Sequence, residues 1–434
     1  MGMRRPDRRA VGIWTLAVLL TAAGVAPLVH HYLVSWPQDQ WQVDLEVYRE
    51  AGRSILFGRP IYDVLTEPPQ LLPFTYPPFA ALVAVPIAVL PFGTAAWIWT
   101  AGQVAASGAT VWIAGRPLLS RAGAWRPVAT AVLTVVMVWL HPLSDGIRFG
   151  QVNAFIVLFC LLDLVVLKPR WMRGLLIGLM TAVKLTPGTF LLFFLAVRRW
   201  RTAAGIVIGA VGATVVALFV LPEASLAYWG GALQDPNRLG PNGGTSNQSI
   251  RGFLIRLGPP GPLGVVVWVA LAVAVLWFGF VIAREAERRG QTALQVGTIG
   301  LVAVLVSPVS WIHHLAWLAV VIPALLGDGR DRVRWGFAVV LTGWFLCRLP
   351  WWGVTWRARH TTTEFFGKAM QNADTVGAVL ALVFIWLALQ RVPLPAAALD
   401  GQVHTGRLEG RDGGQKQAKR AADPADRHQT HVAQ

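Results

Sequence analysis

Asp44 is the residue in this sequence whose type and setting best fit acid–base chemistry. It lies in V-D-L-E-V-Y-R (43–49), a short amphipathic stretch that follows a long apolar segment. A carboxylate partly removed from water can have a raised pKa and can then act as a general base. The same pattern also fits a solvated loop or a helix N-cap, because Asp is a preferred cap residue. The residue alone leaves these interpretations open.

His313, His314 and Lys184 are the next candidates. The histidines end S-P-V-S-W-I-H-H (307–314), and Lys184 lies between two apolar stretches in A-V-K-L-T-P-G (182–188). Adjacent histidines on a helix point about 100° apart, so one metal ion rarely takes both. We therefore expect no metal site and no cofactor, and contact with a phosphate or a sugar hydroxyl fits the histidines better. Lys184 needs either an anion such as a lipid phosphate or a snorkelling path to water.

Other polar residues also lie at the edges of apolar segments, where ionisable groups are costly and are functional candidates by default. We expect the following residues to contribute to binding of a donor or an acceptor: Arg49, Tyr76, Gln151, Asn153, Asn247, Gln248 and Arg251. The sequence has no Walker loop and no GxSxG, HExxH or CxxC motif, so it gives no support to nucleotide-dependent chemistry.

The composition is typical of a membrane protein. Hydrophobic residues make up 55% of the chain and charged residues only 14%, well below the roughly one quarter typical of soluble domains. The net charge of +16 would suggest a nucleic-acid partner in a soluble protein. Here the basic residues form short clusters between apolar segments, as cytoplasmic membrane loops do. We therefore expect membrane lipids as partners and no nucleic acid.

The apolar segments predict an all-α polytopic membrane protein with about twelve transmembrane helices. The expected spans are 11–34, 94–115, 127–141, 152–167, 174–184, 187–197, 202–221, 262–282, 293–309, 313–326, 335–349 and 375–390. Residues 42–57 predict an amphipathic helix on the membrane surface. The proline-rich stretch 76–92 is expected to be re-entrant or to lie on the surface, because a span there would put the next basic loop outside.

This threading predicts one membrane domain, 1–392, with outer loops at 35–75, 222–261 and 350–373. Both termini are expected in the cytoplasm, the protein in the plasma membrane, and 393–434 as a disordered tail. The polar candidates then gather at the outer face, so we expect a site assembled there over a helical scaffold.

Seven short segments, read in order, resemble glycosyltransferase family 87. They are V-D-L-E-V-Y-R (43–49), G-R-P-I-Y-D (58–63), F-T-Y-P-P-F (74–79), F-G-Q-V-N (149–153), K-L-T-P (184–187), N-Q-S-I-R-G (247–252) and S-P-V-S-W-I-H-H (307–314). The resemblance implies a GT-C-type membrane bundle with an extracytoplasmic site. It also implies transfer of mannose with inversion, from polyprenyl-phosphate mannose to a glycolipid or lipoglycan acceptor, in an α-1,2 linkage. Asp44 matches the family's general base, and the resemblance supports Lys184 near the donor phosphate and the pair His313 and His314. We expect Lys184, Arg251 or the two histidines to balance the charge of the leaving phosphate.

Alternatives remain at this stage. The donor sugar could be arabinofuranose or glucose, which similar lipids carry. The chain could also be a transporter or flippase of lipid-linked saccharide, or a structural partner in envelope synthesis. A transporter built from repeats would show internal symmetry, and the sequence has no visible internal repeat.

Overall fold

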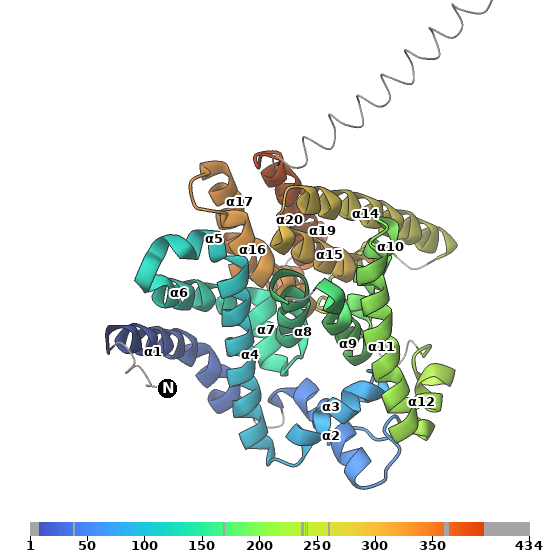
Figure 1. The fold of residues 1–434 in the computed structure, drawn as a ribbon. Coiled ribbons are helices and arrows are strands. Elements are labelled where there is room, and N and C mark those ends of the chain that lie inside the picture. Colours follow the sequence, from blue (N-terminus) through green and yellow to red (C-terminus); the bar gives the residue numbers. More distant parts are fainter. Residues whose placement is uncertain are drawn as a thin grey trace, which may run out of the picture.

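The computed structural model describes residues 8–37, 40–167, 170–235, 238, 240, 242–258, 261–359 and 364–394, and in these ranges its regular secondary structure is helical (Figure 1). The only β pairing within them is two isolated bridges, Leu65 with Pro73 and Asn247 with Trp311. Apart from its first two residues, the predicted disordered tail, 393–434, lies outside the described residues.

The helices follow the apolar segments of the sequence closely. The first half of the chain forms α1 (Arg8–His30), α2 (Val43–Leu56), α3 (Pro78–Ala88), α4 (Phe92–Ala114), α5 (Arg116–Leu119), α6 (Arg126–Trp139), α7 (His141–Phe149), α8 (Asn153–Leu161), α9 (Leu175–Val183) and α10 (Thr189–Ala196). The second half forms α11 (Trp200–Val220), α12 (Pro222–Ala227), α13 (Ile250–Leu257), α14 (Pro262–Arg288), α15 (Thr292–Val306), α16 (Leu318–Leu326), α17 (Arg332–Leu346), α18 (Leu349–Arg359), α19 (Glu364–Gln371) and α20 (Ala373–Leu389). Each predicted span overlaps one of these helices, and α2 is the predicted amphipathic helix.

The helices make this a polytopic helical membrane protein. In the described part, four helical segments are long and apolar enough to cross a bilayer, and three bent pairs raise the number to seven if each pair is one span. Helix α3 turns back on α4 by 114°. With 11 residues it is about 16 Å long, too short for a hydrocarbon core of about 30 Å. The count of twelve spans stays a prediction.

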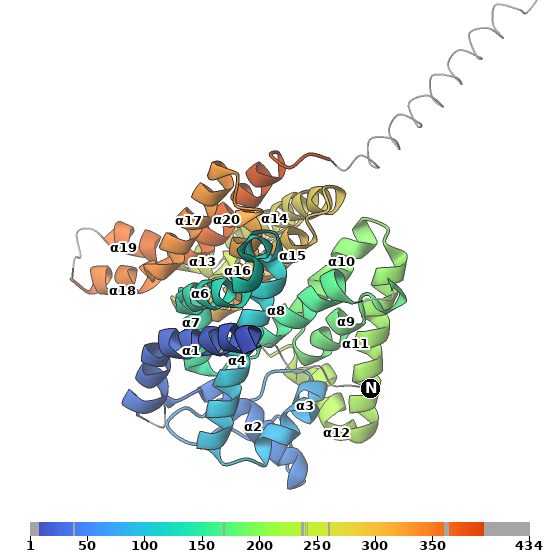
Figure 2. The same ribbon diagram turned by 60° about the vertical axis from the view of Figure 1, so that its left-hand side comes forward.

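Two of the predicted outer loops contain helices that the sequence analysis did not predict. The stretch 222–261 holds α12 and α13, and 350–373 coincides largely with α18 and α19, which lie side by side and project from the molecule (Figure 2). Small residues allow this close pairing: a Cβ on Gly353 would lie 2.5 Å from the carbonyl oxygen of Gly367. The sequence analysis missed these helices because they are too short and too polar to resemble spans.

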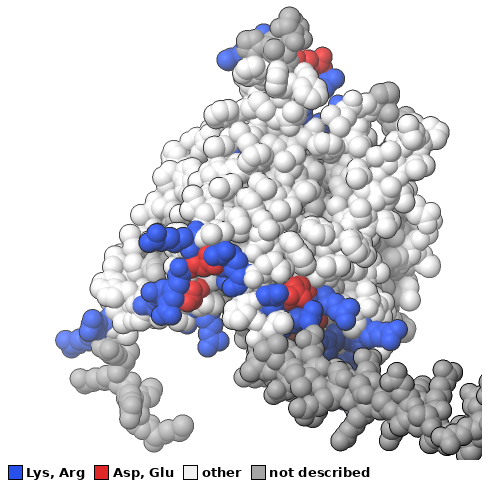
Figure 3. Space-filling view, turned by 90° about the horizontal axis from the view of Figure 1, so that it is seen from above, with Lys and Arg blue, Asp and Glu red and all other residues white. Residues whose placement is uncertain are grey.

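The basic loops lie together on one side of the molecule. Arg121 donates to the carbonyl of Asp328 at 2.8 Å, and ion pairs join Arg199 to Glu287 at 2.7 Å and Arg391 to Asp331 at 2.6 Å. Figure 3 shows such charged groups along one side, separated by a broad uncharged band from a charged group on the opposite side. An uncharged band of this kind is what a lipid-facing surface requires.

The polar loops meet on their own side. Arg238 donates to the carbonyl of Tyr62 at 2.5 Å, which joins the loop after α12 to the loop after α2. Arg256 of α13 donates to Asn372, before α20, at 2.6 Å. The three predicted outer loops are therefore tied to one another.

The centre of the bundle is formed by α15 and α16. All of α16 is buried, and α15 is buried from Leu294 to Leu305. Gly297 makes their close approach possible, because an added Cβ would lie 2.5 Å from the Val321 side chain of α16. An added Cβ on Gly300 would lie 2.0 Å from the ring of Trp317, just before α16. This core fixes the position of the 3-10 helix Ile312–Trp317, which carries His313 and His314.

Candidate active site

Asp44 lies in the first turn of α2, at the edge of the bundle. Val43, Leu45 and Val47 bury the inner face of this helix, while the Asp44 side chain is half-buried. The N-cap is Gln42 rather than Asp44, so the cap interpretation of the carboxylate was wrong. The first turn of a helix favours a negative charge. Burial nevertheless raises the pKa of Asp44. His313, the Gln151 amide and Lys184 lower this pKa and offset the effect of burial only partly.

The start of α2 is held against α4 and α7. The Gln42 side chain donates to Thr100 Oγ1 at 2.6 Å and to the carbonyl of Ile147 at 3.3 Å. Close packing here requires Gly150, which follows α7 with a φ of +69°. A Cβ at Gly150 would lie 2.7 Å from the Cβ of Leu45. This glycine therefore sets both the end of α7 and the distance to α2.

Gln151 connects the carboxylate to a buried cation. Its Nε2 donates to Asp44 Oδ2 at 2.6 Å. Its Oε1 accepts from Tyr48 at 3.2 Å and from Lys184 at 3.4 Å. Gln151 is only 2% exposed, so its orientation is fixed by these partners and it orients Asp44 in turn.

Lys184 is a buried ammonium without a carboxylate partner. It lies in the extended break between α9 and α10, and its Nζ donates to Asn153 Oδ1 at 3.1 Å and to His314 Nε2 at 3.0 Å. The ammonium also lies 5.2 Å from the centre of the Tyr76 ring. None of the described carboxylates is within salt-bridge distance of Lys184. A buried cation with neutral partners is a site prepared for an anion.

The two histidines have different partners. His313 Nδ1 pairs with Asp145 Oδ2 at 3.1 Å, and the backbone carbonyl of His313 accepts from Asn153 at 3.1 Å. His314 Nε2 accepts from Lys184, so the ring is neutral with its proton on Nδ1. His313 Nε2 and His314 Nδ1 are buried and have no hydrogen-bond partner among the described residues. Buried polar atoms of this kind call for an explanation, and a bound polar substrate is one.

The structure thus joins most of the predicted site residues in one polar network. We name it the Asp44–Lys184 network, and its members are Asp44, Tyr48, Tyr76, Asp145, Gln151, Asn153, Lys184, His313 and His314. Asp44, Tyr76 and His314 are half-buried, whereas the other members are buried. The half-buried side chains form the edge at which a substrate can reach the network.

Two members of the network were missed by the sequence analysis. Tyr48 lies one helical turn after Asp44, so a search for polar residues at i+4 would have found it. Its hydroxyl donates to Tyr76 at 3.0 Å. Asp145 lies in a short stretch between two predicted spans. Only its pairing with His313 in the folded protein identifies it as a site residue.

Four predicted site residues lie outside the network. Arg49 stacks on Phe92 and donates to the carbonyl of Leu90 at 2.5 Å, which holds α2 against the end of α3. Arg251 lies over the ring of Trp268 at 5.7 Å. The structure does not bring either residue together with Asp44.

Asn247 and Gln248 are fully buried, and their side chains form hydrogen bonds with other segments of the protein. Asn247 Oδ1 accepts from the backbone N–H of Ser310 at 2.9 Å, just before the histidine pair. Gln248 Oε1 accepts from the backbone N–H of Thr375 at 2.8 Å. These contacts hold the segment that carries His313 and the start of α20.

A second buried cluster braces α7 from the other side. His141 Nδ1 pairs with Asp374 at 3.0 Å, and His141 Nε2 accepts from Trp351 at 2.9 Å. Since α7 also carries Asp145, this cluster fixes the partner of His313. Among the described residues, no group of three or more His, Cys, Asp or Glu side chains could hold a metal ion.

Comparison with known proteins agrees with the resemblance found in the sequence. The model of glycosyltransferase family 87 matches residues 74–308, more than half of the chain. This match includes Tyr76, Gln151, Asn153 and Lys184, whereas Asp44 precedes it. No solved structure matches the chain.

Three curated relatives are similar over most of the chain. A polyprenol-phosphate-mannose-dependent α-(1-2)-phosphatidylinositol mannoside mannosyltransferase of Mycolicibacterium smegmatis is 31% identical over 93% of this chain and 95% of its own. Two phosphatidylinositol pentamannoside mannosyltransferases are also similar. The Mycobacterium tuberculosis protein is 34% identical over 78% of both chains, and the M. smegmatis protein is 35% identical over 77% of this chain and 81% of its own. The chain is a membrane glycosyltransferase and belongs to glycosyltransferase family 87.

Proposed function

We propose that this protein transfers a mannosyl residue from polyprenyl-phosphate mannose to a glycolipid or lipoglycan acceptor, forming an α-1,2 linkage with inversion. Relatives at 31–35% identity carry this donor and phosphatidylinositol mannoside acceptors in their names. The observation that carries the proposal is the Gln151 bridge, which holds the Asp44 carboxylate and the Lys184 ammonium in one buried network. A base and an anion site are the two parts that such a transfer needs.

The proposed reaction is a single displacement. Asp44 accepts the proton of an acceptor hydroxyl while the hydroxyl oxygen attacks the anomeric carbon of the donor. The bond between that carbon and the phosphate oxygen breaks, and polyprenyl phosphate leaves with the electron pair. Because the attack comes from the face opposite to the phosphate, a β-linked donor gives an α-linked product.

Lys184 and His314 are suited to receive the leaving phosphate. The Lys184 ammonium supplies a buried positive charge, and His314 has a ring N–H without a partner. Such preorganised donors stabilise charge that develops in a transition state. Phosphate is already a good leaving group, so no separate general acid is required.

The proposed orientation is based on the basic loops that lie together on one side of the molecule. Cytoplasmic loops carry the excess of Lys and Arg, so the side with Arg121, Arg199 and Arg391 would face the cytoplasm, together with both termini. The Asp44–Lys184 network would then lie at the extracytoplasmic face of the plasma membrane. If the four shorter apolar helices also span, the count rises from seven to eleven. The predicted twelfth span would then be α9, which has 9 residues.

The experiment is a transfer assay with the purified protein in lipid nanodiscs. Polyprenyl-phosphate mannose with a radiolabelled sugar is supplied with phosphatidylinositol mannosides of different length. The expected result is a labelled glycolipid whose new sugar is released by an α-mannosidase. The proposal fails if mannose is not transferred while a lipid-linked arabinofuranose or glucose is, or if labelled lipid crosses the bilayer without a new glycosidic bond.

A further inference from the structure

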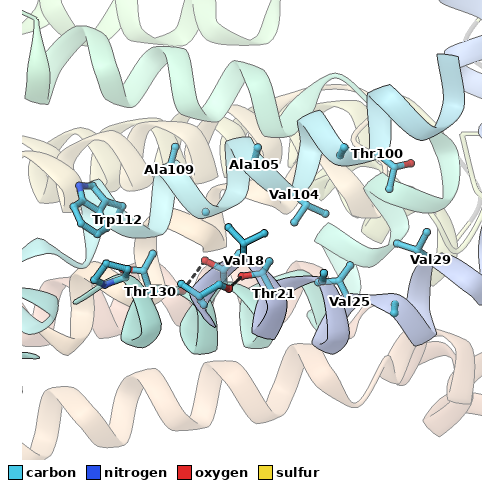
Figure 4. Close-up of a pocket in the computed structure, with 18 of the residues that line it drawn as sticks. Val18, Thr21, Val25, Val29, Thr100, Val104, Ala105, Ala109, Trp112 and Thr130 are labelled. Atoms are coloured by element: carbon cyan, nitrogen blue, oxygen red, sulfur yellow. Dashed lines mark hydrogen bonds between the residues drawn. The ribbon is translucent and has the colours of Figure 1, made fainter. Parts of the chain in front are cut away.

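A large apolar groove lies between α1, α4 and α6. Its volume is about 730 Å³. Figure 4 shows α1 and α4 along its two sides, with Val29 and Thr100 toward one end and Trp112 toward the other. Helix α6 contributes Pro127, Thr130, Ala131 and Thr134 to the lining. None of the residues that line the groove is a member of the Asp44–Lys184 network.

The lining of this groove offers almost no polar partner. Its floor is made of small side chains, among them Ala101, Ala105 and Ala109 of α4. The hydroxyls of Thr21 and Thr134 are bonded within their own helices, to Ala17 and Thr130. A surface with satisfied hydroxyls and exposed methyl groups is suited to hydrocarbon and to little else.

One end of the groove adjoins the candidate active site. Thr100 lines that end, and its hydroxyl accepts from Gln42 at 2.6 Å. Gln42 caps α2 two residues before Asp44. At the other end the rings of Trp14 and Trp112 lie 5.6 Å apart. A chain in the groove would therefore begin beside the start of α2 and run away from it.

The groove is longer than one leaflet of a bilayer is thick. Its α4 lining runs from Trp97 to Trp112, about 22 Å along the helix axis. Half of the hydrocarbon core is only about 15 Å thick. An acyl chain anchored in one leaflet would end near the midplane, whereas a long isoprenoid chain can fill the whole groove.

We infer that this groove holds the polyprenyl chain of the sugar donor; the inference rests on the proposed function. In such a donor the chain is joined through one phosphate to the carbon that reacts, so it must leave the site directly. In a mannoside acceptor the lipid part is separated from the reacting hydroxyl by further sugars. The position of the groove beside the start of α2 therefore fits the donor chain.

The test is to fill the groove and to compare two donors. Ala105→Trp puts an indole into the middle of the groove, at an alanine that is exposed. Ala204→Trp makes the same change at an exposed alanine of α11, outside the groove. Each variant is assayed in nanodiscs with full-length polyprenyl-phosphate mannose and with a donor that has only two isoprene units.

In Ala105→Trp the indole displaces part of the long donor's chain from the groove. Because that chain then buries fewer methylene groups, KM for the long donor should rise at least about tenfold. The short donor should be used equally by Ala105→Trp and wild type, and Ala204→Trp should match wild type with both donors. An unchanged KM for the long donor in Ala105→Trp overturns the inference. Selective loss of the long donor in Ala204→Trp also overturns it, because the chain would then lie on α11.

A binding measurement separates failure of this inference from failure of the proposed function. Wild-type protein is irradiated with a polyprenyl phosphate that carries a photoreactive group in its chain, and the labelled peptides are identified. Label on α1, α4 or α6 that Ala105→Trp removes supports the groove even if the wild type transfers no mannose. Label confined to helices outside the groove contradicts it even if transfer is efficient.

Discussion

Replacement of Gln151 tests whether the network sets the protonation of Asp44. Gln151→Met keeps a side chain of similar size but removes the amide that donates to Asp44 Oδ2 at 2.6 Å. This hydrogen bond favours the charged carboxylate, and burial disfavours it. Without the amide, the pKa of Asp44 should rise further above its ordinary value.

The expected size of the effect follows from the strength of a hydrogen bond to a charged group. Such a bond contributes about 1.5–3 kcal/mol, and about 1.4 kcal/mol corresponds to one pKa unit. Loss of the bond should therefore raise the pKa of Asp44 and lower kcat/KM at low pH by about ten- to hundredfold. Since a general base must be unprotonated, kcat/KM falls as the pH drops below this pKa. The acid limb of the pH profile should then move to higher pH.

The assay is transfer from polyprenyl-phosphate mannose over a range of pH, at donor concentrations below KM. At high pH the variant should regain much of its activity, because Asp44 is then unprotonated. The control is Gln295→Met, which removes another buried glutamine, on α15, whose Nε2 has no described partner. An acid limb that does not move in Gln151→Met would refute the reasoning, and so would an equal shift in Gln295→Met.

Three further predictions follow from the geometry. Lys184→Met should raise KM for the donor and weaken inhibition by polyprenyl phosphate. The substitution removes the buried charge that is proposed to face the phosphate. Unchanged inhibition by polyprenyl phosphate would argue against this role. Asp145→Asn and His313→Gln should each lower kcat. The double variant should lose no more activity than the less active single variant, because the two side chains form one pair. Additive losses of activity would show that the two residues have independent roles. Gly150→Ala should lower the thermal midpoint of the protein in nanodiscs, because an alanine there costs about 1–2 kcal/mol in the left-handed region and lies too close to Leu45; an unchanged midpoint would contradict the packing described.

Much of the architecture could be predicted from the sequence. Apolar segments and basic clusters are strong local signals, so the apolar helices and the amphipathic α2 were predicted close to their observed bounds. The same pattern gave Asp44, Gln151 and Lys184 as candidates, because polar residues beside apolar segments are conspicuous. The structure brings these three side chains together although they lie far apart in the chain.

The remaining features depend on contacts between distant segments. Nothing in the sequence around Asp145 indicates that it pairs with His313, 168 residues away. Asn247 resembled a binding residue because it is polar and lies near an apolar segment, yet its side chain holds the backbone at Ser310. The groove is formed by small residues on α1 and α4 that meet only in the folded protein. Local patterns identify such residues but not their partners.

The central claim is that Asp44 is the base for glycosyl transfer at this site. The most direct measurement is the single-turnover rate of Asp44→Asn in nanodiscs that are saturated with polyprenyl-phosphate mannose. Asparagine keeps the size of the side chain but cannot accept the proton, so the rate should fall by about 10²–10⁴-fold while donor binding is retained. A rate close to that of the wild type, with the donor bound, would contradict the account.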